Sequence, residues 1–166
     1  MFVAFFSATN QRRATVTTPT DTQILITREF DAPRNLVYQA FTTPDLLRRW
    51  WHANRAEVTG IEMDVRVGGS WRWEAKAFNG YEFAFYGEYL EVVPHERLAT
   101  TETFSGAPEA LAVNATTFTE KDGRTYLEIL VEHQTMENRD AQLNSGMEDG
   151  LQDALILLEE LVRERM

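Results

Sequence analysis

Short segments rich in β-branched and aromatic residues recur between residues 23 and 133, and several of them alternate with polar residues. Such segments are typical of strands that bury one face. They predict seven strands, at residues 23–30, 57–64, 70–78, 81–92, 97–104, 111–120 and 124–133. The alternation is clearest in the third segment, where Trp71, Trp73, Ala75 and Ala77 point to one side. Asn79-Gly80 follows it and predicts a type I′ hairpin turn, which needs positive φ at both central residues.

Two short helices are predicted between the first and second strands. Asp31 is a suitable N-cap, and Pro33 fits the first helical turn, where its missing N–H costs nothing. The sequence Thr43-Pro44-Asp45 repeats this start signal. It predicts a second short helix that runs from Pro44 to about residue 51.

A long helix is predicted at the end of the chain, over residues 146–165. Leu151, Leu155 and Leu158 belong to an apolar stripe with three- and four-residue spacing. Ser145 and Glu148 before this stripe fit a capping box. Such a helix is about 30 Å long and needs a large apolar surface, which only the sheet can supply. We therefore predict an α+β domain in which a curved antiparallel sheet of about seven strands wraps the C-terminal helix, with a trough between them.

The first 22 residues differ from the rest, and we expect the folded domain to span residues 23–166. Residues 1–22 hold an apolar run at residues 2–6, then Arg12 and Arg13, then a threonine-rich stretch. A signal peptide has the opposite order of charge and apolar residues. We expect an N-terminal extension that is loosely ordered or packs on the surface, and a misassigned start is the alternative.

Composition limits the partners that this chain can bind. Its 166 residues include 16 Lys and Arg against 26 Asp and Glu, a net charge of −10. Such a surface repels phosphate backbones and anionic lipid, and no apolar run is long enough to span a membrane. We therefore expect no nucleic-acid and no membrane partner. The absence of cysteine excludes disulfides and thiolate sites, and fits a reducing cytoplasm.

The sequence contains no G-x-S-x-G, H-E-x-x-H, P-loop or G-x-G-x-x-G motif. The three histidines, His52, His95 and His133, lie far apart without the spacing of metal ligands. We therefore expect no metal and no cofactor, and assign no catalytic residue.

Two titratable residues are nevertheless predicted to point into the trough. His133 shares a strand face with Ile129 and Val131. It is either a hydrogen-bonded histidine at the rim of the sheet or a polar group at the mouth of a cavity. Glu102, on a strand face with Leu98 and Thr100, is a weaker candidate of the same kind.

Several short motifs, in order over residues 24–162, carry a resemblance to a known family. They are Phe30-Asp31-Ala32-Pro33, Thr43-Pro44-Asp45-Leu46 before Trp50-Trp51, Gly68-Gly69-Ser70-Trp71, Val93-Pro94-His95-Glu96-Arg97-Leu98 and Ser145-Gly146-Met147-Glu148-Asp149-Gly150. Together they resemble the START-like, or SRPBCC, superfamily, in the branch similar to the C-terminal domain of the activator of heat-shock protein 90 ATPase. The resemblance implies a helix-grip fold. Tyr38 and Leu151 stand where members often carry Trp and a bulky aromatic residue, and both differences would alter the shape of a cavity.

The trough and the resemblance together suggest three functions. The first is binding of a small hydrophobic molecule, the second an enzyme of the polyketide cyclase or dehydratase type, and the third a protein-interaction module similar to the chaperone activator. We rank them in this order, because few polar groups point inward and no exposed patch of binding residues is evident. The sequence leaves a homodimer open. The predicted cavity residues are Tyr38, Trp50, Trp71, Trp73, Phe85, Glu102, Ile129, Val131, His133, Met147, Leu151 and Ala154.

Overall fold

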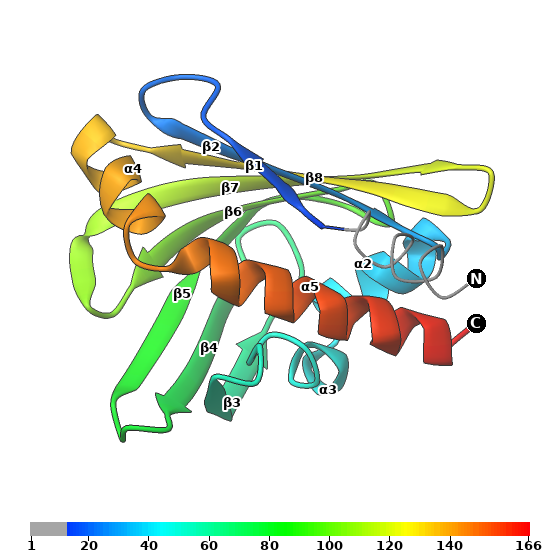
Figure 1. The fold of residues 1–166 in the computed structure, drawn as a ribbon, viewed down its shortest axis with the longest axis horizontal. Coiled ribbons are helices and arrows are strands. Elements are labelled where there is room, and N and C mark those ends of the chain that lie inside the picture. The colour runs from blue at the N-terminus through cyan, green and yellow to red at the C-terminus, as the bar shows by residue number, and fades with distance from the viewer. Residues whose placement is uncertain (1–12) are drawn as a thin grey trace, which may run out of the picture.

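The computed structural model describes residues 13–166, which form one antiparallel sheet with a long helix, α5, across one face (Figure 1). The strands are β1 (Thr15–Thr17), β2 (Gln23–Phe30), β3 (Ala56–Met63), β4 (Ser70–Ala77), β5 (Glu82–Val93), β6 (Arg97–Phe104), β7 (Ala107–Lys121) and β8 (Arg124–His133). The helices are α2 (Arg34–Thr42), α3 (Pro44–Leu47), α4 (Met136–Leu143) and α5 (Met147–Glu164). The strand order β1-β2-β8-β7-β6-β5-β4-β3 describes a sheet that curves around α5. The predicted α+β helix-grip architecture is confirmed, with eight strands where about seven were predicted.

The additional strand, β1, comes from the segment that we expected to be loosely ordered or packed on the surface. It pairs along its whole length with the edge of β2. Just before it, the backbone N–H of Ala14 donates to Oε1 of Gln152 at 2.9 Å, and Nε2 of Gln152 donates to the Ala14 carbonyl at 2.8 Å. The expectation is therefore corrected for residues 14–17, because β-branched residues suit an edge strand and α5 holds it in place. Residues 1–12 lie outside the described part of the chain.

The start of α2 differs from the predicted cap. The helix begins at Arg34 and its N-cap position is Pro33, which makes no side-chain cap. The Arg34 N–H donates to Oε1 of Glu120 at 2.8 Å. Asp31 instead forms ion pairs with Arg124, at 2.9 Å, and with Arg163, at 3.6 Å. These tertiary partners, which the local sequence does not show, draw the carboxylate away from the helix end.

The start of α5 is also not the predicted capping box. Gly146 occupies the N-cap position with φ 82°, a left-handed conformation that favours glycine. The Ser145 hydroxyl donates to the carbonyl of Gln142 at 2.6 Å and so does not cap α5. The helix α3 is shorter than predicted, since it ends at Leu47 and is followed by turns.

The helix α4 lies between the last predicted strand and the predicted C-terminal helix, where no element was predicted. The Thr135 hydroxyl caps this helix by accepting a hydrogen bond from the Asn138 N–H at 3.0 Å. None of the residues of α4 is buried. The helix was missed because it has no apolar stripe.

The predicted type I′ turn at Asn79-Gly80 is wrong, whereas Asp122-Gly123, between β7 and β8, has the backbone of such a turn. At Asn79-Gly80 only the glycine has a positive φ, 93°. At Asp122-Gly123 both residues have positive φ, 54° and 75°, as a type I′ turn requires. The predicted strand pairing of β4 with β5 is nevertheless present.

The protein is densely filled beneath the C-terminal half of α5. Leu158 and Val162 of the helix are fully buried against Phe30, Phe118 and Leu127, which come from three different strands. Within residues 13–166, no helix is long and apolar enough to cross a membrane.

Candidate functional site

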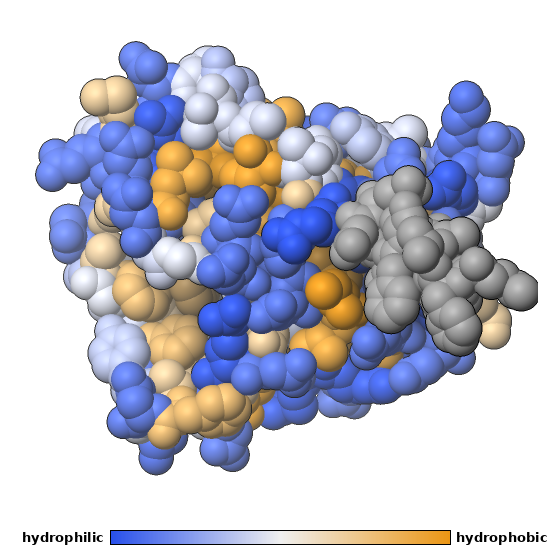
Figure 2. Space-filling model, viewed as in Figure 1, coloured by the Kyte–Doolittle hydropathy of each residue, from blue (hydrophilic) through white to orange (hydrophobic). Residues whose placement is uncertain are grey.

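A cavity of about 530 Å³ lies between the sheet and the N-terminal half of α5. On the helix side it is bordered by Met147, Gly150, Leu151, Ala154 and Leu155. Gly150 has no side chain and Ala154 has only a methyl group, so this part of the helix fills little of the space beside it. Apolar side chains are visible between α5 and strands β4 and β5 in the space-filling view (Figure 2).

The wall of the cavity opposite the helix is mainly aromatic. Its rings come from α2, from the turns after α3, and from β4 and β5; they are Phe41, Trp50, Trp51, Trp71, Trp73, Phe83, Phe85 and Tyr89. The ring centroid of Trp51 lies 5.5 Å from that of Trp73 and 6.1 Å from that of Phe85, both edge to face. Rigid rings held at such angles leave gaps in a curved sheet, because they cannot reshape to fill them.

Glu102 and Asn114 form a polar spot in this apolar wall. The register pairs Glu102 of β6 with Ala112 of β7, and Thr100 with Asn114. Glu102 and Asn114 are therefore diagonal neighbours on the face that lines the cavity. The side chain of Asn114 hydrogen-bonds to the Glu102 carboxyl group.

Three buried polar atoms at the cavity have no hydrogen-bond partner within residues 13–166. They are Nε1 of Trp71, Nε1 of Trp73 and Oδ1 of Asn114. By contrast, Nε1 of Trp50 donates to the Ala40 carbonyl at 2.9 Å. Leaving a buried polar group unpaired costs about 1–3 kcal/mol. Two indole donors and one amide acceptor therefore lie unpaired in residues that border the cavity.

The surroundings of Glu102 and Tyr89 shift the pKa of each side chain from its ordinary value. Burial raises the pKa of Glu102, and the hydrogen bond with Asn114 offsets part of this rise. Burial also raises the pKa of Tyr89, and the nearby Tyr38 and Asp64 raise it further. Both groups are therefore biased toward their neutral forms.

The family model described as "Activator of Hsp90 ATPase homolog 1-like protein" matches residues 31–163. The chain belongs to this family. No match was found among curated proteins.

Several solved structures of bacterial proteins are similar to this family member over most of their length. A Rhodobacter sphaeroides protein has a TM-score of 0.84 and 23% identity, with 91% of this chain and 99% of that chain covered. A Chromobacterium violaceum protein has a TM-score of 0.73 and 31% identity, with 86% and 98% covered. An AHSA1-like protein of Aeromonas hydrophila has a TM-score of 0.64 and 22% identity, with 85% and 93% covered. These likenesses agree with the START-like fold.

Most residues predicted to line the cavity are brought together there by this AHSA1-like fold. Those that border it are Trp50, Trp71, Trp73, Phe85, Glu102, Ile129, Val131, Met147, Leu151 and Ala154. They come from strands and helices far apart in the sequence, so the curvature of the sheet is what collects them.

Tyr38 and His133 do not border the cavity. The ring of Tyr38 packs edge to face on His95, at 5.3 Å between centroids, and on Phe118, at 5.5 Å. His133 does lie in line with Val131, but its Nε2 hydrogen-bonds to the side chain of Gln142. Gln142 belongs to α4 and itself borders the cavity, so this unpredicted helix separates the histidine from the space.

Several lining residues were not predicted, and Asn114 is the most informative. It alternates with Ala112, Thr116 and Phe118, which are buried. This alternation in β7 was a usable signal that Asn114 faces inward. Arg55 also borders the cavity, where it forms an exposed ion pair with Asp153 of α5 at 2.7 Å.

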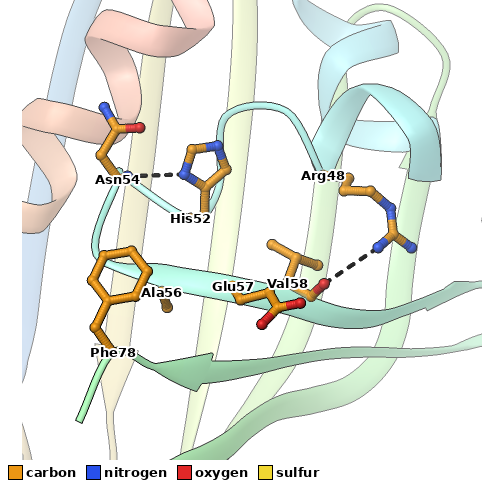
Figure 3. Close-up of a pocket in the computed structure, with 7 residues that line it drawn as sticks. All are labelled: Arg48, His52, Asn54, Ala56, Glu57, Val58 and Phe78. Atoms are coloured by element: carbon orange, nitrogen blue, oxygen red, sulfur yellow. Dashed lines mark hydrogen bonds between the residues drawn. The ribbon is translucent and has the colours of Figure 1, made fainter. Parts of the chain in front are cut away.

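A second, shallower groove of about 320 Å³ lies beside β3 and shares His52 with the cavity. Figure 3 shows that the side chains of His52 and Arg48 in this groove are hydrogen-bonded to nearby backbone groups. Nδ1 of His52 accepts from the Asn54 N–H at 2.9 Å, and Arg48 donates to the Val58 carbonyl at 3.4 Å. Within the described chain, no group of three or more His, Asp or Glu side chains could hold a metal ion. The larger cavity is therefore the better candidate site.

Proposed function

We propose that this protein binds a small, largely hydrophobic molecule in the cavity between the sheet and α5. The observation that carries the proposal is a space of about 530 Å³ with mainly aromatic walls and one polar spot. Pockets for small ligands typically have volumes of about 300–1,000 Å³ and combine apolar walls with few polar groups. Membership of the START-like superfamily supports the same function by analogy of fold.

The proposal can be tested with the neutral apolar dye N-phenyl-1-naphthylamine. All four tryptophans of the chain border the cavity, so a dye bound there should quench or accept their fluorescence. The substitution Ala154→Phe places a ring in the space and should weaken dye binding at least about tenfold, with an overpacking cost of about 1–3 kcal/mol. Circular dichroism would show that this variant is folded.

The matched control is Ile156→Phe, which adds a ring to the exposed side of the same helix. This variant should bind the dye as the parent does. Equal dye binding by the parent and the Ala154→Phe variant, or no binding by the parent, would contradict the proposal.

An enzyme of the cyclase or dehydratase type is the second candidate. The observation in its favour is that Glu102 and Asn114 meet in the cavity, because such chemistry requires convergent polar groups that move or stabilise a proton. Binding ranks first because it requires no further group.

A further inference from the structure

The Glu102 carboxyl group is left uncovered by its neighbours in the sheet. On one side it pairs with Ala112 of β7, whose side chain is a single methyl group. On the other side, the pairs Tyr86–Thr103 and Tyr89–Thr100 place Gly87 of β5 opposite Glu102. No larger residue fits at position 87, since an added Cβ would lie 2.0 Å from the Thr101 carbonyl oxygen.

No described residue supplies a cation to this carboxyl group. Within residues 13–166, no Lys, Arg or His forms an ion pair with Glu102. The other titratable residues that border the cavity are His52, Arg55 and Tyr89. Arg55 pairs with Asp153, and His52 bonds to the backbone on both of its ring nitrogens. A carboxylate in this position therefore has no countercharge of its own.

Asn114 adds a second acceptor beside Glu102. Its side chain hydrogen-bonds to Glu102, while its Oδ1 is buried without a partner in the described chain. A ligand group between the two side chains would have to donate at least two hydrogen bonds to satisfy both. A primary ammonium group has three N–H donors and also supplies the missing charge.

The walls around the polar spot favour a cation for an independent reason. Trp71 of β4 pairs with Gly87, which in turn lies opposite Glu102. Trp71 and Glu102 are therefore in the same row across the sheet, on either side of a glycine. Trp73 lies next to Trp71, with ring centroids 4.7 Å apart. Aromatic faces attract cations, and desolvation strengthens this attraction. The net charge of −10 further draws cationic ligands to the protein and repels anionic ones.

We propose that the ligand is a hydrophobic amine whose protonated nitrogen binds between Glu102 and Asn114, with its apolar body against the aromatic wall. This inference rests on the proposed binding function and specifies the class of ligand. A neutral ligand with a carbonyl group, which would use the free indole N–H groups of Trp71 and Trp73, is the competing chemistry.

The raised pKa of Glu102 gives the proposal a testable proton linkage. In the free protein, burial favours the protonated carboxyl group, whereas the bound ammonium requires the carboxylate. Binding should therefore release a proton, and the affinity for an amine should increase with pH as Glu102 ionises. A neutral ligand should show no such increase. The other titratable groups near Glu102 are His52, Arg55 and Tyr89, which border the same cavity. His133 is separated from the cavity by Gln142.

Three probes with the same ring system separate these chemistries in isothermal titration calorimetry. They are 1-naphthylmethylamine, the neutral 1-naphthalenemethanol and the anionic 1-naphthoate. Near neutral pH the amine should bind about 10- to 100-fold more tightly than the alcohol, the effect of one charge-assisted hydrogen bond. The anion should bind most weakly. Repeating the titration in buffers of different ionisation enthalpy would measure the released proton.

Two variants assign the preference to the polar spot. Glu102→Gln keeps the size of the side chain and its hydrogen-bonding capacity, and should abolish the advantage of the amine while the alcohol still binds. Glu88→Gln removes an exposed carboxylate from β5 and should keep that advantage.

The possible failures are distinct. The inference is overturned if the amine binds no more tightly than the alcohol, or if Glu102→Gln leaves the advantage of the amine unchanged. In either case, binding of the alcohol would still support the proposed function. If neither the alcohol nor N-phenyl-1-naphthylamine binds, the proposed function fails as well.

Discussion

The two halves of α5 lie against the same sheet, but one half packs closely on it and the other borders a cavity. In the C-terminal half, Leu158 and Val162 have no accessible surface and the space below them is filled. In the N-terminal half, Met147 and Leu151 are only partly buried and border a cavity. The size of the helix side chains differs between the two halves. Leu158 and Val162 close the first space, whereas Gly150 and Ala154, opposite a wall of large rings, leave part of the second one open.

The same contrast holds for the buried carboxyl groups of the two regions. Glu159, in the C-terminal half, lies 3.7 Å from Arg28 of β2, and the two side chains are 9% and 3% exposed. Glu102, below the N-terminal half, has no cation from residues 13–166 within ion-pair distance. The packed region thus contains a compensated charge, and the open region a carboxyl group that burial biases toward its neutral form. We therefore expect the first region to contribute most to stability and the second to be the site of the proposed binding.

The largest effect is expected from breaking the buried ion pair. Glu159→Ala leaves Arg28 buried without this carboxylate and should lower the free energy of unfolding by about 3–5 kcal/mol. The matched change at the open end is Asp153→Ala. It removes the ion pair with Arg55, whose two side chains are about half exposed, and should cost about 0–1 kcal/mol. Urea denaturation measures both variants, and equal costs would contradict the contrast between the regions.

The next effect compares identical truncations of α5. Leu158→Ala should lower the free energy of unfolding by about 2–5 kcal/mol, because it empties a filled space. Leu151→Ala enlarges a space that already exists and should cost about 1 kcal/mol or less. If Leu151→Ala proves as costly as Leu158→Ala, the N-terminal half of α5 is packed as tightly as the other half.

The smallest effect is the pH dependence that Glu102 contributes to stability. Its pKa is raised in the folded state, so above the ordinary carboxyl range the folded protein keeps a proton that the unfolded chain has lost. Its contribution to the free energy of unfolding should then fall as pH rises toward the folded pKa, by at most about 1.4 kcal/mol per pH unit. Below the ordinary carboxyl range both states are protonated, and this contribution is constant.

Glu102→Gln removes this proton, so the variant should gain stability relative to the parent as pH rises. Denaturant midpoints across the acidic to neutral range would measure this difference. A difference that does not change with pH would show that Glu102 titrates as an ordinary surface carboxyl group. Glu88→Gln again serves as the exposed control.

Local patterns were sufficient for much of the fold and for the cavity wall. Alternation assigned Trp71 and Trp73 to the inner face, and the same rule would have assigned Asn114. Alternation also put His133 on the inner face, but could not reveal that Gln142 of α4 lies between it and the cavity. Periodicity predicts which face of the sheet a residue occupies. The residues that it contacts there depend on which other helices and strands pack on that face.

The sequence by itself determined the order of strands β2 to β8 and of helices α2, α3 and α5, the apolar stripe of α5 and the acidic surface, because these depend on residue spacing and composition. Only the tertiary structure decided that the space under α5 is filled at one end and open at the other. It also decided that Asp31 pairs with arginines instead of capping a helix, and that β1 joins the sheet. Each of these outcomes depends on the distance between groups far apart in the chain, and that distance is set by how the whole sheet curves around the helix.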